Sequence, residues 1–200
     1  MLTVQLPGFK DLTRDSQKTF RALLEVLSLP GRMIEIEVNL KAPDGLTAAC
    51  AAACLTLVDL ETNVWLQPGL STGVRDWLQF HTGCTFVASP KQAAFAVIEN
   101  ADSLNLEQFC WGSAENPEVS TTLLIQVEAL ENSSSDNNLP VKLSGPGIRH
   151  ENTISPRLPN GFWQQWVQNH AAYPQGVDVF LFEGRSVLGL PRTVHAQVKG

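Results

Sequence analysis

The sequence predicts a single-domain α/β fold over residues 1–200, a three-layer sandwich in which helices cover a mixed sheet. Helix-type and strand-type hydrophobic patterns are mixed along the chain, which favours helices packed on a sheet. Its 200 residues suffice for one full hydrophobic core. We find no internal repeat and no linker that would divide the chain into two domains.

The first predicted helix follows Asp15, a residue type that caps helices, and Pro30-Gly31 ends it. Apolar residues recur in it at i, i+3, i+4 and i+7 and form one stripe, made of Phe20, Leu23, Leu24 and Leu27. We expect this stripe to face the core.

Residues 33–38 alternate apolar and acidic side chains, which predicts a half-exposed strand. A turn at Pro43-Asp44-Gly45 leads into a helix over residues 47–59. Because this helix is apolar nearly all round, we expect it to be buried within a layer. Residues 64–66 form a short strand.

Ser71 or Thr72 caps the next predicted helix, and Gly83 is well placed to end it. One of its faces carries Val74, Trp77, Leu78 and His81. Short apolar runs then predict strands at 85–88, 94–98 and 121–130, with a short helix at 106–111 between the last two.

The C-terminal third begins with the polar run 131–138, which we expect to be a flexible loop because it holds no apolar anchor. A strand at 139–143 and a helix at 161–171 follow. The inward residues of that helix are predicted to be Phe162, Trp163, Trp166 and Val167. A hairpin closes the chain, with strands at 177–182 and 186–190 around a turn at 183–185.

Composition excludes several functions. The net charge is −6 and the lysines and arginines are spread singly, so we do not expect nucleic-acid binding. The N-terminus lacks the pattern of a signal peptide, and the longest apolar stretch, around residues 48–58, is too short to span a bilayer. We therefore expect a cytoplasmic protein that does not contact membranes, with its four cysteines present as thiols.

The sequence does not predict a metal site. Cys50 and Cys54 lie one helical turn apart, but no further ligand is close in sequence, so packing in an alanine-rich helix is the better interpretation. Four scattered histidines show no metal-ligand spacing. The glycine-rich run 143–148 lacks the Lys-Ser/Thr of a phosphate loop, and Pro146 has no N–H, so a structural turn is expected.

Five residues at the ends of elements are the candidate ligand contacts, and no catalytic set can be named. Arg192 and Thr193 follow the last predicted strand, where they could hold a carboxylate or phosphate; the alternative is a surface salt bridge. Arg21, Asp59 and His81 are weaker candidates. Asp59 is either a pocket acid or a turn residue, and His81 either reaches a pocket or is a half-buried ring at a helix end.

Taken together, these segments resemble the PhnH family of the bacterial carbon–phosphorus lyase system along nearly the whole chain. The resemblance lies in the order and spacing of several short motifs: Phe20-Arg21-x-Leu23-Leu24, Ser28-x-Pro30-Gly31, Leu55-Thr56-Leu57-x-Asp59-x-x-Thr62-x-Val64-Trp65-Leu66, Phe80-His81-Thr82, Gly145-Pro146-Gly147-Ile148, Pro174-x-Gly176-x-Asp178 and Pro191-Arg192-Thr193.

The resemblance implies a fold similar to that of pyridoxal-phosphate-dependent transferases, without the cofactor. It implies a subunit that acts with PhnG, PhnI and PhnL when an alkylphosphonate displaces adenine from ATP, giving α-D-ribose 1-methylphosphonate 5-triphosphate. It also implies a homodimer in isolation and assembly with PhnG, PhnI and PhnJ, alongside PhnK and PhnL.

Two alternatives remain open. The chain could be a structural adaptor in that complex, without a ligand site of its own. It could also be a stand-alone enzyme with a cofactor, although none of its lysines lies in a motif that would hold a pyridoxal Schiff base. These lysines are Lys10, Lys18, Lys41, Lys91, Lys142 and Lys199.

Overall fold

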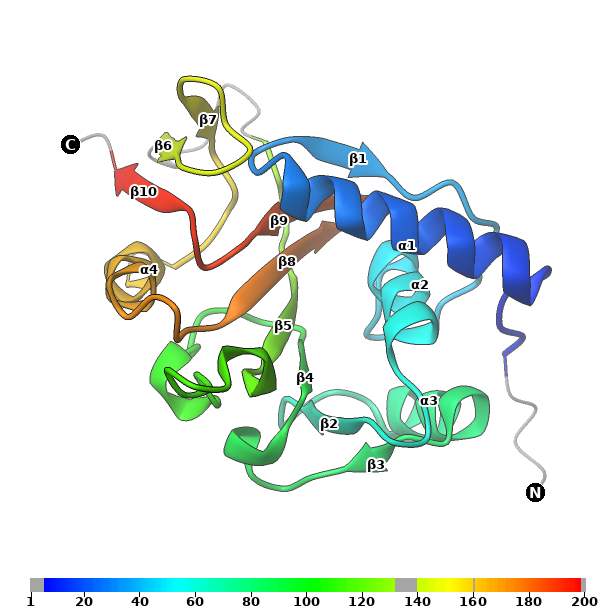
Figure 1. Ribbon diagram of the computed structural model, residues 1–200. Helices are drawn as coiled ribbons and strands as arrows, with labels where there is room; N and C mark the ends of the chain where they lie inside the picture. The colour runs from blue at the N-terminus through cyan, green and yellow to red at the C-terminus, as the bar shows by residue number, and fades with distance from the viewer. Residues whose placement is uncertain (1–5, 132–139, 160, 199–200) are drawn as a thin grey trace.

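A mixed β-sheet forms the centre of the molecule (Figure 1). The computed structural model describes residues 6–131, 140–159 and 161–198. Within this part, seven strands join in the order β1 (Met33–Glu35), β9 (Ser186–Leu190), β8 (Asp178–Glu183), β5 (Thr122–Gln126), β4 (Phe95–Ile98), β2 (Asn63–Leu66) and β3 (Thr85–Phe86). The five strands from β8 to β3 are parallel, whereas β9 and β1 add an antiparallel edge.

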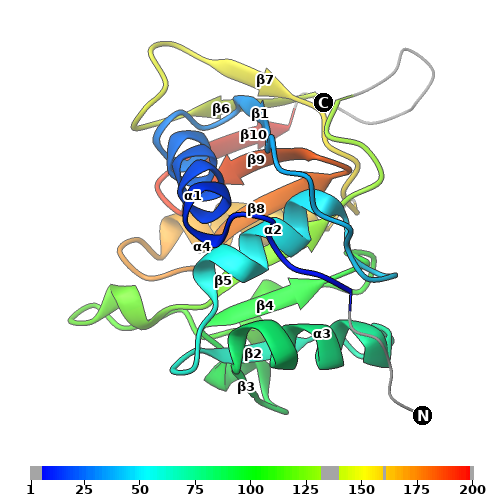
Figure 2. The ribbon, with the colours of Figure 1, turned by 90° about the vertical axis from the view of Figure 1, so that its right-hand side faces the viewer.

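Three helices cover one face of this sheet: α1 (Leu12–Ser28), α2 (Ala48–Leu57) and α3 (Thr72–Thr82). Figure 2 looks onto this face and shows the three helices lying in front of the strands. Side chains such as Val97 of β4 and Leu124 of β5 point into the core beneath these helices.

The opposite face is covered by α4 (Phe162–Ala171) and a small antiparallel sheet. That sheet consists of β10 (His195–Val198), β6 (Val141–Ser144) and β7 (Asn152–Ile154). Three short 3₁₀ turns lie in the connections between strands: η1 (Pro90–Gln92) between β3 and β4, and η2 (Leu106–Gln108) and η3 (Pro117–Val119) between β4 and β5. A second core, which includes Trp166 and Phe109, fills the space under α4.

These layers confirm an α/β fold with a mixed sheet and helices on both faces. The similarity to pyridoxal-phosphate-dependent transferases stays a prediction of the family resemblance. Among the residues that the structure describes, no helix is both long enough and apolar enough to cross a membrane.

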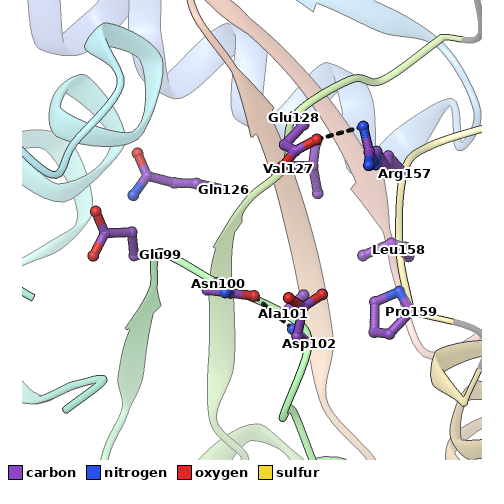
Figure 3. A pocket seen from close by; sticks show the side chains of 10 residues that line it. All are labelled: Glu99, Asn100, Ala101, Asp102, Gln126, Val127, Glu128, Arg157, Leu158 and Pro159. Atoms are coloured by element: carbon purple, nitrogen blue, oxygen red, sulfur yellow. Dashed lines mark hydrogen bonds and ion pairs between the residues drawn. The ribbon is translucent and has the colours of Figure 1, made fainter. Parts of the chain in front are cut away.

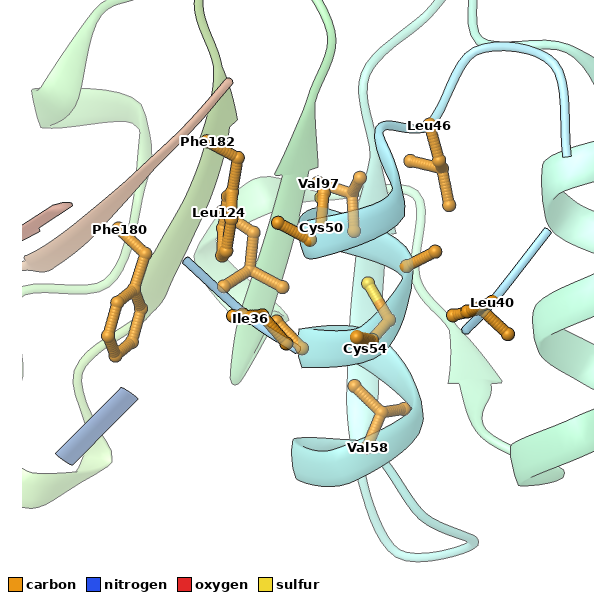
Figure 4. Packing of buried hydrophobic residues seen from close by; sticks show 14 of the residues in the cluster. Ile36, Leu40, Leu46, Cys50, Cys54, Val58, Val97, Leu124, Phe180 and Phe182 are labelled. Carbon is orange, nitrogen blue, oxygen red and sulfur yellow. The ribbon is translucent and has the colours of Figure 1, made fainter. Parts of the chain in front are cut away.

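The helix predicted to be buried within a layer is buried as expected. Residues 49–54 of α2 are all almost completely inaccessible to solvent. Figure 4 shows Cys50 and Cys54 on this helix, with Phe182 and Leu124 of the sheet on one side and Leu40 on the other. Alanine and cysteine side chains are small, so the helix can lie close to the elements that surround it.

The prediction for α1 was partly wrong. The helix begins earlier than expected: Asp11 is its N-cap and accepts a hydrogen bond from Arg14 N, while Asp15 lies inside the first turn and accepts one from Asp11 N. Phe20 and Leu24 are 50% and 55% exposed. Leu23 is buried as predicted, and Thr19, Ala22 and Val26 complete the buried side of α1.

The other two amphipathic helices agree better with their patterns. In α3, Val74, Trp77 and Leu78 are buried as predicted, and Gly83 ends the helix with a φ of 68°. In α4, Phe162, Trp163 and Trp166 are buried, but Val167 is 46% exposed, so its predicted inward position was wrong.

The remaining differences concern short strands and element ends. The predicted strand at 33–38 is regular only over β1, and the run 121–130 stops being a strand after Gln126. The chain also contains β7 and β10, which the hydrophobic pattern did not predict because each is a segment of three or four residues with a single buried side chain. Apart from Glu131, the predicted 131–138 loop lies outside the described residues.

Candidate functional site

Arg192 and Thr193 follow β9, at the edge of the sheet where the parallel strands begin. Because β9 runs antiparallel to β8, its last residue Leu190 pairs with Val179 near the start of β8. Arg192 therefore lies beside Asp178, the first residue of β8. We call this side the amino edge of the sheet.

The Arg192 guanidinium is already fully hydrogen-bonded within the chain. Nε and Nη2 contact the Asp178 carboxylate, the latter at 2.6 Å, and Nη2 also donates to Ser120 Oγ. Nη1 donates to the backbone oxygens of Pro117 and Pro174. A guanidinium has five N–H donors, so an anion would have to displace one of these partners.

Thr193 lies with Arg192 in an open cleft of about 340 Å³ that also includes Pro117, Tyr173 and Asp178. Asp178 borders a second, smaller groove of about 190 Å³ with mostly apolar walls, to which Phe20 and Leu24 belong. The structure thus brings Arg192 and Thr193 together, as their adjacent positions require. Their role as anion contacts stays a prediction.

Arg21 and Asp59 lie apart from that cleft. Arg21 is exposed on α1 and has no hydrogen bond or ion pair to any described residue. Asp59 is exposed in the turn before β2, where its Oδ1 accepts hydrogen bonds from Thr62 Oγ1 at 2.6 Å and from Glu61 N. These bonds, chiefly the one from Thr62, hold the pKa of Asp59 below its ordinary value.

His81 packs against the N-terminal segment. Its Nε2 lies 2.9 Å from the backbone oxygen of Leu6, which also accepts a hydrogen bond from Trp77 Nε1. Since a carbonyl oxygen only accepts, His81 must carry its proton on Nε2 in this arrangement. No hydrogen bond or ion pair joins any two of the five predicted site residues in the described part of the chain.

The glycine-rich run 143–148 starts in β6 and continues as a structural turn. Gly147 has a φ of 81°, and a Cβ atom there would lie 2.1 Å from the backbone oxygen of Ser28. Only glycine allows the turn to approach the end of α1 this closely. The motif around Pro30 is held at the same place, because Asn152 Nδ2 donates to Pro30 O.

The sheet topology predicts a ligand site at the opposite edge of the sheet, where the parallel strands end. From β2 the chain runs through α3 on one face of the sheet and reaches β3, which lies on the side of β2 away from β4. From β4 the chain runs along the other face, where Leu106 and Phe109 are buried, and reaches β5, which lies on the side of β4 away from β2. In open α/β sheets, ligands bind at the carboxyl ends of strands where the order reverses in this way.

A glutamine side chain bridges the segments that follow β2 and β4. Gln67 Oε1 accepts hydrogen bonds from the N–H groups of Glu99 and Asn100, and Gln67 Nε2 donates to Asn100 O at 2.7 Å. These bonds fix the start of the loop that follows β4. The space available for a ligand therefore opens one strand further along, between β4 and β5.

We call this space the carboxyl-edge cleft. Its volume is about 600 Å³, and Figure 3 shows the side chains that line it. Three segments contribute: residues 99–102 after β4, residues 126–128 at the end of β5, and residues 157–159. The third segment is tied to the second by an ion pair of 2.6 Å between Arg157 and Glu128 and by a hydrogen bond from Arg157 N to Ala129 O.

Gln126 holds the inner end of the cleft in place. It is 92% buried, since only 8% of its surface is exposed. Its Oε1 accepts from Thr47 N at 2.5 Å and its Nε2 donates to Gly45 O at 2.8 Å. The beginning of α2 is thereby attached to the end of β5, which makes the cleft part of the rigid sheet framework.

The cleft is predominantly acidic. Glu99, Asp102 and Glu128 contribute carboxylates, and Arg157 contributes the single positive charge. Within the described ranges, no group of three or more histidine, cysteine, aspartate or glutamate side chains is arranged to hold a metal ion. Chemically, the cleft offers hydrogen-bond acceptors next to an apolar surface.

Sequence reasoning missed this cleft, although part of the signal was present. The strand at 94–98 was predicted, and the polar residues Glu99 and Asn100 follow it directly. The rule that ligands bind at carboxyl ends of parallel strands would have selected them. Arg157 could not be found in this way, because only the tertiary fold brings residues 157–159 to the end of β5.

Comparison with known proteins gives consistent matches over nearly the full chain. A protein-family model described as bacterial phosphonate metabolism protein (PhnH) matches residues 7–197. A protein of Rhizobium meliloti (strain 1021), named alpha-D-ribose 1-methylphosphonate 5-triphosphate synthase subunit PhnH, is 36% identical over 189 residues, which cover 93% of this chain and 92% of the relative.

A second relative, from Stutzerimonas stutzeri, is named putative C-P lyase subunit protein HtxG. It is 30% identical over 185 residues, which cover 92% of this chain and 87% of the relative. These matches confirm the resemblance that the motifs indicated: the chain belongs to the PhnH family of bacterial phosphonate metabolism proteins.

Proposed function

We propose that this chain is a subunit of the enzyme that makes α-D-ribose 1-methylphosphonate 5-triphosphate. The observation that carries the proposal is the 36% identity, over 93% of the chain, to a relative whose name states this role. The second relative, named as a carbon–phosphorus lyase subunit, supports membership of the same system.

In the proposed reaction, an alkylphosphonate oxygen forms a bond to C1′ of the ATP ribose. The bond between C1′ and N9 of adenine breaks, and adenine leaves after taking up a proton. The triphosphate stays on the ribose, so atoms and charge balance without an oxidant or reductant. The chain would act in this step with PhnG, PhnI and PhnL, in the cytoplasm.

Assembly with further chains is part of the proposal. We propose that the isolated protein is a homodimer and that it joins PhnG, PhnI and PhnJ in a larger complex, alongside PhnK and PhnL. Large apolar side chains on the surface of α1, including Phe20 and Leu24, provide area that a protein partner could cover. Light scattering at micromolar concentration tests the dimer, and a monomeric mass would contradict it.

The decisive experiment is reconstitution. The chain is co-expressed with PhnG, PhnI and PhnL, and adenine release from ATP is measured with and without methylphosphonate. We expect adenine release that depends on methylphosphonate and on this chain. If the other subunits release adenine at the same rate without it, the proposed function is wrong.

The same assay separates a ligand-contacting subunit from a structural adaptor. Arg192→Ala tests the predicted anion contact, and a double change of Glu99→Gln with Asp102→Asn tests the carboxyl-edge cleft. An adaptor would keep the rate and the KM values for both substrates in every variant that still assembles. The cleft, in which the Glu99 and Asp102 carboxylates have no partner among the described residues, favours a ligand-contacting role over the adaptor.

The positions of the lysines support a function without a Schiff-base cofactor. Lys91 donates to the backbone oxygens of Glu107 and Phe109, and Lys142 is paired with Glu151. None of the five lysines that the structure describes lines any of the clefts described above. An absorbance spectrum of the pure protein checks this point, because a bound pyridoxal group would absorb in the near ultraviolet or visible range.

A further inference from the structure

The acidic side chains of the carboxyl-edge cleft differ in how they are bonded. Glu128 is paired with Arg157. Glu99 and Asp102 use their backbone N–H groups in hydrogen bonds to Gln67 and Asn100, but their carboxylates have no partner among the residues that the structure describes. Two carboxylates beside one cleft are therefore available as acceptors for a ligand.

Apolar side chains complete the lining. Ala101, Val127, Leu158 and Pro159 belong to the same three segments as the polar groups. In Figure 3, Leu158 and Pro159 lie across the cleft from Glu99 and Gln126. A flat ring could contact the apolar side while its polar groups face the carboxylates. Small-molecule sites commonly combine an apolar lining with a few such polar groups.

The size of the cleft sets a limit on its occupant. Its volume of about 600 Å³ lies within the range of roughly 300–1,000 Å³ that is typical of small-molecule sites. This is enough for a sugar or nucleoside. The cleft lies at the carboxyl ends of β4 and β5, one strand away from the point where the strand order reverses, so it is on the edge of the sheet where ligands bind in open α/β sheets.

The charge of the lining decides which part of a ligand can enter. Three carboxylates and one guanidinium leave an excess of negative charge, and the guanidinium is neutralised by Glu128. Phosphate and phosphonate groups would be repelled. Hydroxyl and amino groups, in contrast, can donate hydrogen bonds to Glu99 and Asp102, and a bond to an ionised acceptor is stronger than one between neutral groups.

We propose that the carboxyl-edge cleft binds a nucleoside, with Glu99 and Asp102 accepting hydrogen bonds from its hydroxyl or amino groups and with any phosphates directed out of the cleft. This inference rests on the proposed function, because the nucleotide substrate contains such a group. The anionic phosphonate and triphosphate would then be bound by basic groups of partner subunits. This chain would help to position the ring from which adenine leaves.

Binding of adenosine to the full chain tests the inference directly. Adenosine is titrated by calorimetry or equilibrium dialysis, and we expect saturable binding with a Kd of about 1 mM or lower. The double variant Glu99→Gln and Asp102→Asn keeps the shape of both side chains but removes their charge. We expect it to weaken adenosine binding by at least about tenfold, because two charge-assisted hydrogen bonds are lost.

A matched control is Asp76→Asn, which removes an exposed carboxylate from α3 outside the cleft. It should leave adenosine binding unchanged. Methylphosphonate, inorganic phosphate and putrescine serve as competing probes. The inference is overturned if adenosine fails to saturate at about 10 mM, if the double variant binds as well as the wild type, or if methylphosphonate or putrescine binds in the cleft in place of adenosine.

Failure here can be told apart from failure of the proposed function. If adenosine does not bind but the reconstituted complex needs this chain for adenine release, only the cleft assignment is wrong. If adenosine binds through Glu99 and Asp102 but the complex works without this chain, the proposed function is wrong and the cleft assignment stands.

Discussion

Arg192 and Asp178 form a largely buried ion pair, with Nη2 and Oδ2 2.6 Å apart and side chains that are only 12% and 24% exposed. Asp178 Oδ1 also accepts a hydrogen bond from Arg192 N. Because the guanidinium also bonds Pro117 O, Pro174 O and Ser120 Oγ, it joins the start of β8 to two separate loops.

We expect Arg192→Ala to lower the free energy of unfolding by about 2–4 kcal/mol, because the change leaves the Asp178 carboxylate without its partner. Urea denaturation measures this effect. The control Arg32→Ala breaks an ion pair to Glu25 whose side chains are 59% and 43% exposed, and should cost less than about 1 kcal/mol. Equal effects of the two substitutions would contradict the structural role of Arg192.

Gly189 in β9 should not tolerate a side chain. A Cβ atom there would lie 2.7 Å from the backbone of Val26 in α1. We expect Gly189→Ala to destabilise the protein by about 1–3 kcal/mol, because helix and strand must move apart. Gly73→Ala, near the open start of α3, is the matched change and should be neutral or stabilising by up to about 1 kcal/mol. Thermal unfolding of both variants checks the prediction.

The pKa of Asp59 should depend on Thr62. Its lowered pKa arises first from the Thr62 hydroxyl and then from Glu61 N. In Thr62→Val, which keeps the shape but removes the donor, we expect the pKa of Asp59 to rise toward its ordinary value. NMR titration of the carboxyl carbon measures it, and an unchanged pKa would show that the hydroxyl bond is not formed.

The lowered pKa of Asp59 also makes the stability of the fold depend on pH, in a direction that can be stated. A carboxyl whose pKa is lower in the folded state stabilises the fold above its unfolded pKa. This contribution is lost as the pH falls through the folded pKa. The stability difference between the wild type and Thr62→Val should therefore shrink in acid, as measured by denaturation at a series of pH values.

The four thiols should differ in reactivity. Cys50, Cys54 and Cys84 are buried, whereas Cys110 is partly accessible. A hydrogen bond with Cys54, together with burial, raises the pKa of the Cys50 thiol, and burial raises the pKa of Cys84. Since the thiolate is the reactive form, we expect an aromatic disulfide reagent to modify only Cys110 in the native protein.

Cys110→Ser is the control for this assignment. The native variant should then show no fast-reacting thiol, while denaturation should expose the remaining three. Rapid modification of the native variant would mean that α2, which carries Cys50 and Cys54, or the segment before β3, which carries Cys84, is less tightly packed than its burial indicates.

Features of a helix that depend on residues close in the sequence were predicted better than features that depend on contacts with distant segments. For α3, the stripe of Val74, Trp77 and Leu78 and the glycine at 83 lie within one short segment and were predicted correctly, and of the two caps predicted, Ser71 or Thr72, the structure has Ser71. For α1, the periodicity was correct, but of the predicted buried face Phe20 and Leu24 are exposed while Leu23 is buried. Phe20 and Leu24 compete with Ala22 and Val26 for the core, and the close approach of α1 to Gly189 favours the smaller side chains.

The sequence by itself determined the α/β class, the position of most helices and strands, and the family, since all of these depend on local patterns and on the order of short motifs. Only the tertiary structure decided where the ligand-sized cleft lies and which charged groups are available. Arg192 donates a hydrogen bond to Pro117 O, 75 positions away in the sequence. Arg157 lies at the end of β5 because its segment folds back there and pairs with Glu128. Such contacts depend on strand order, because it is the sheet that brings distant segments within hydrogen-bonding distance.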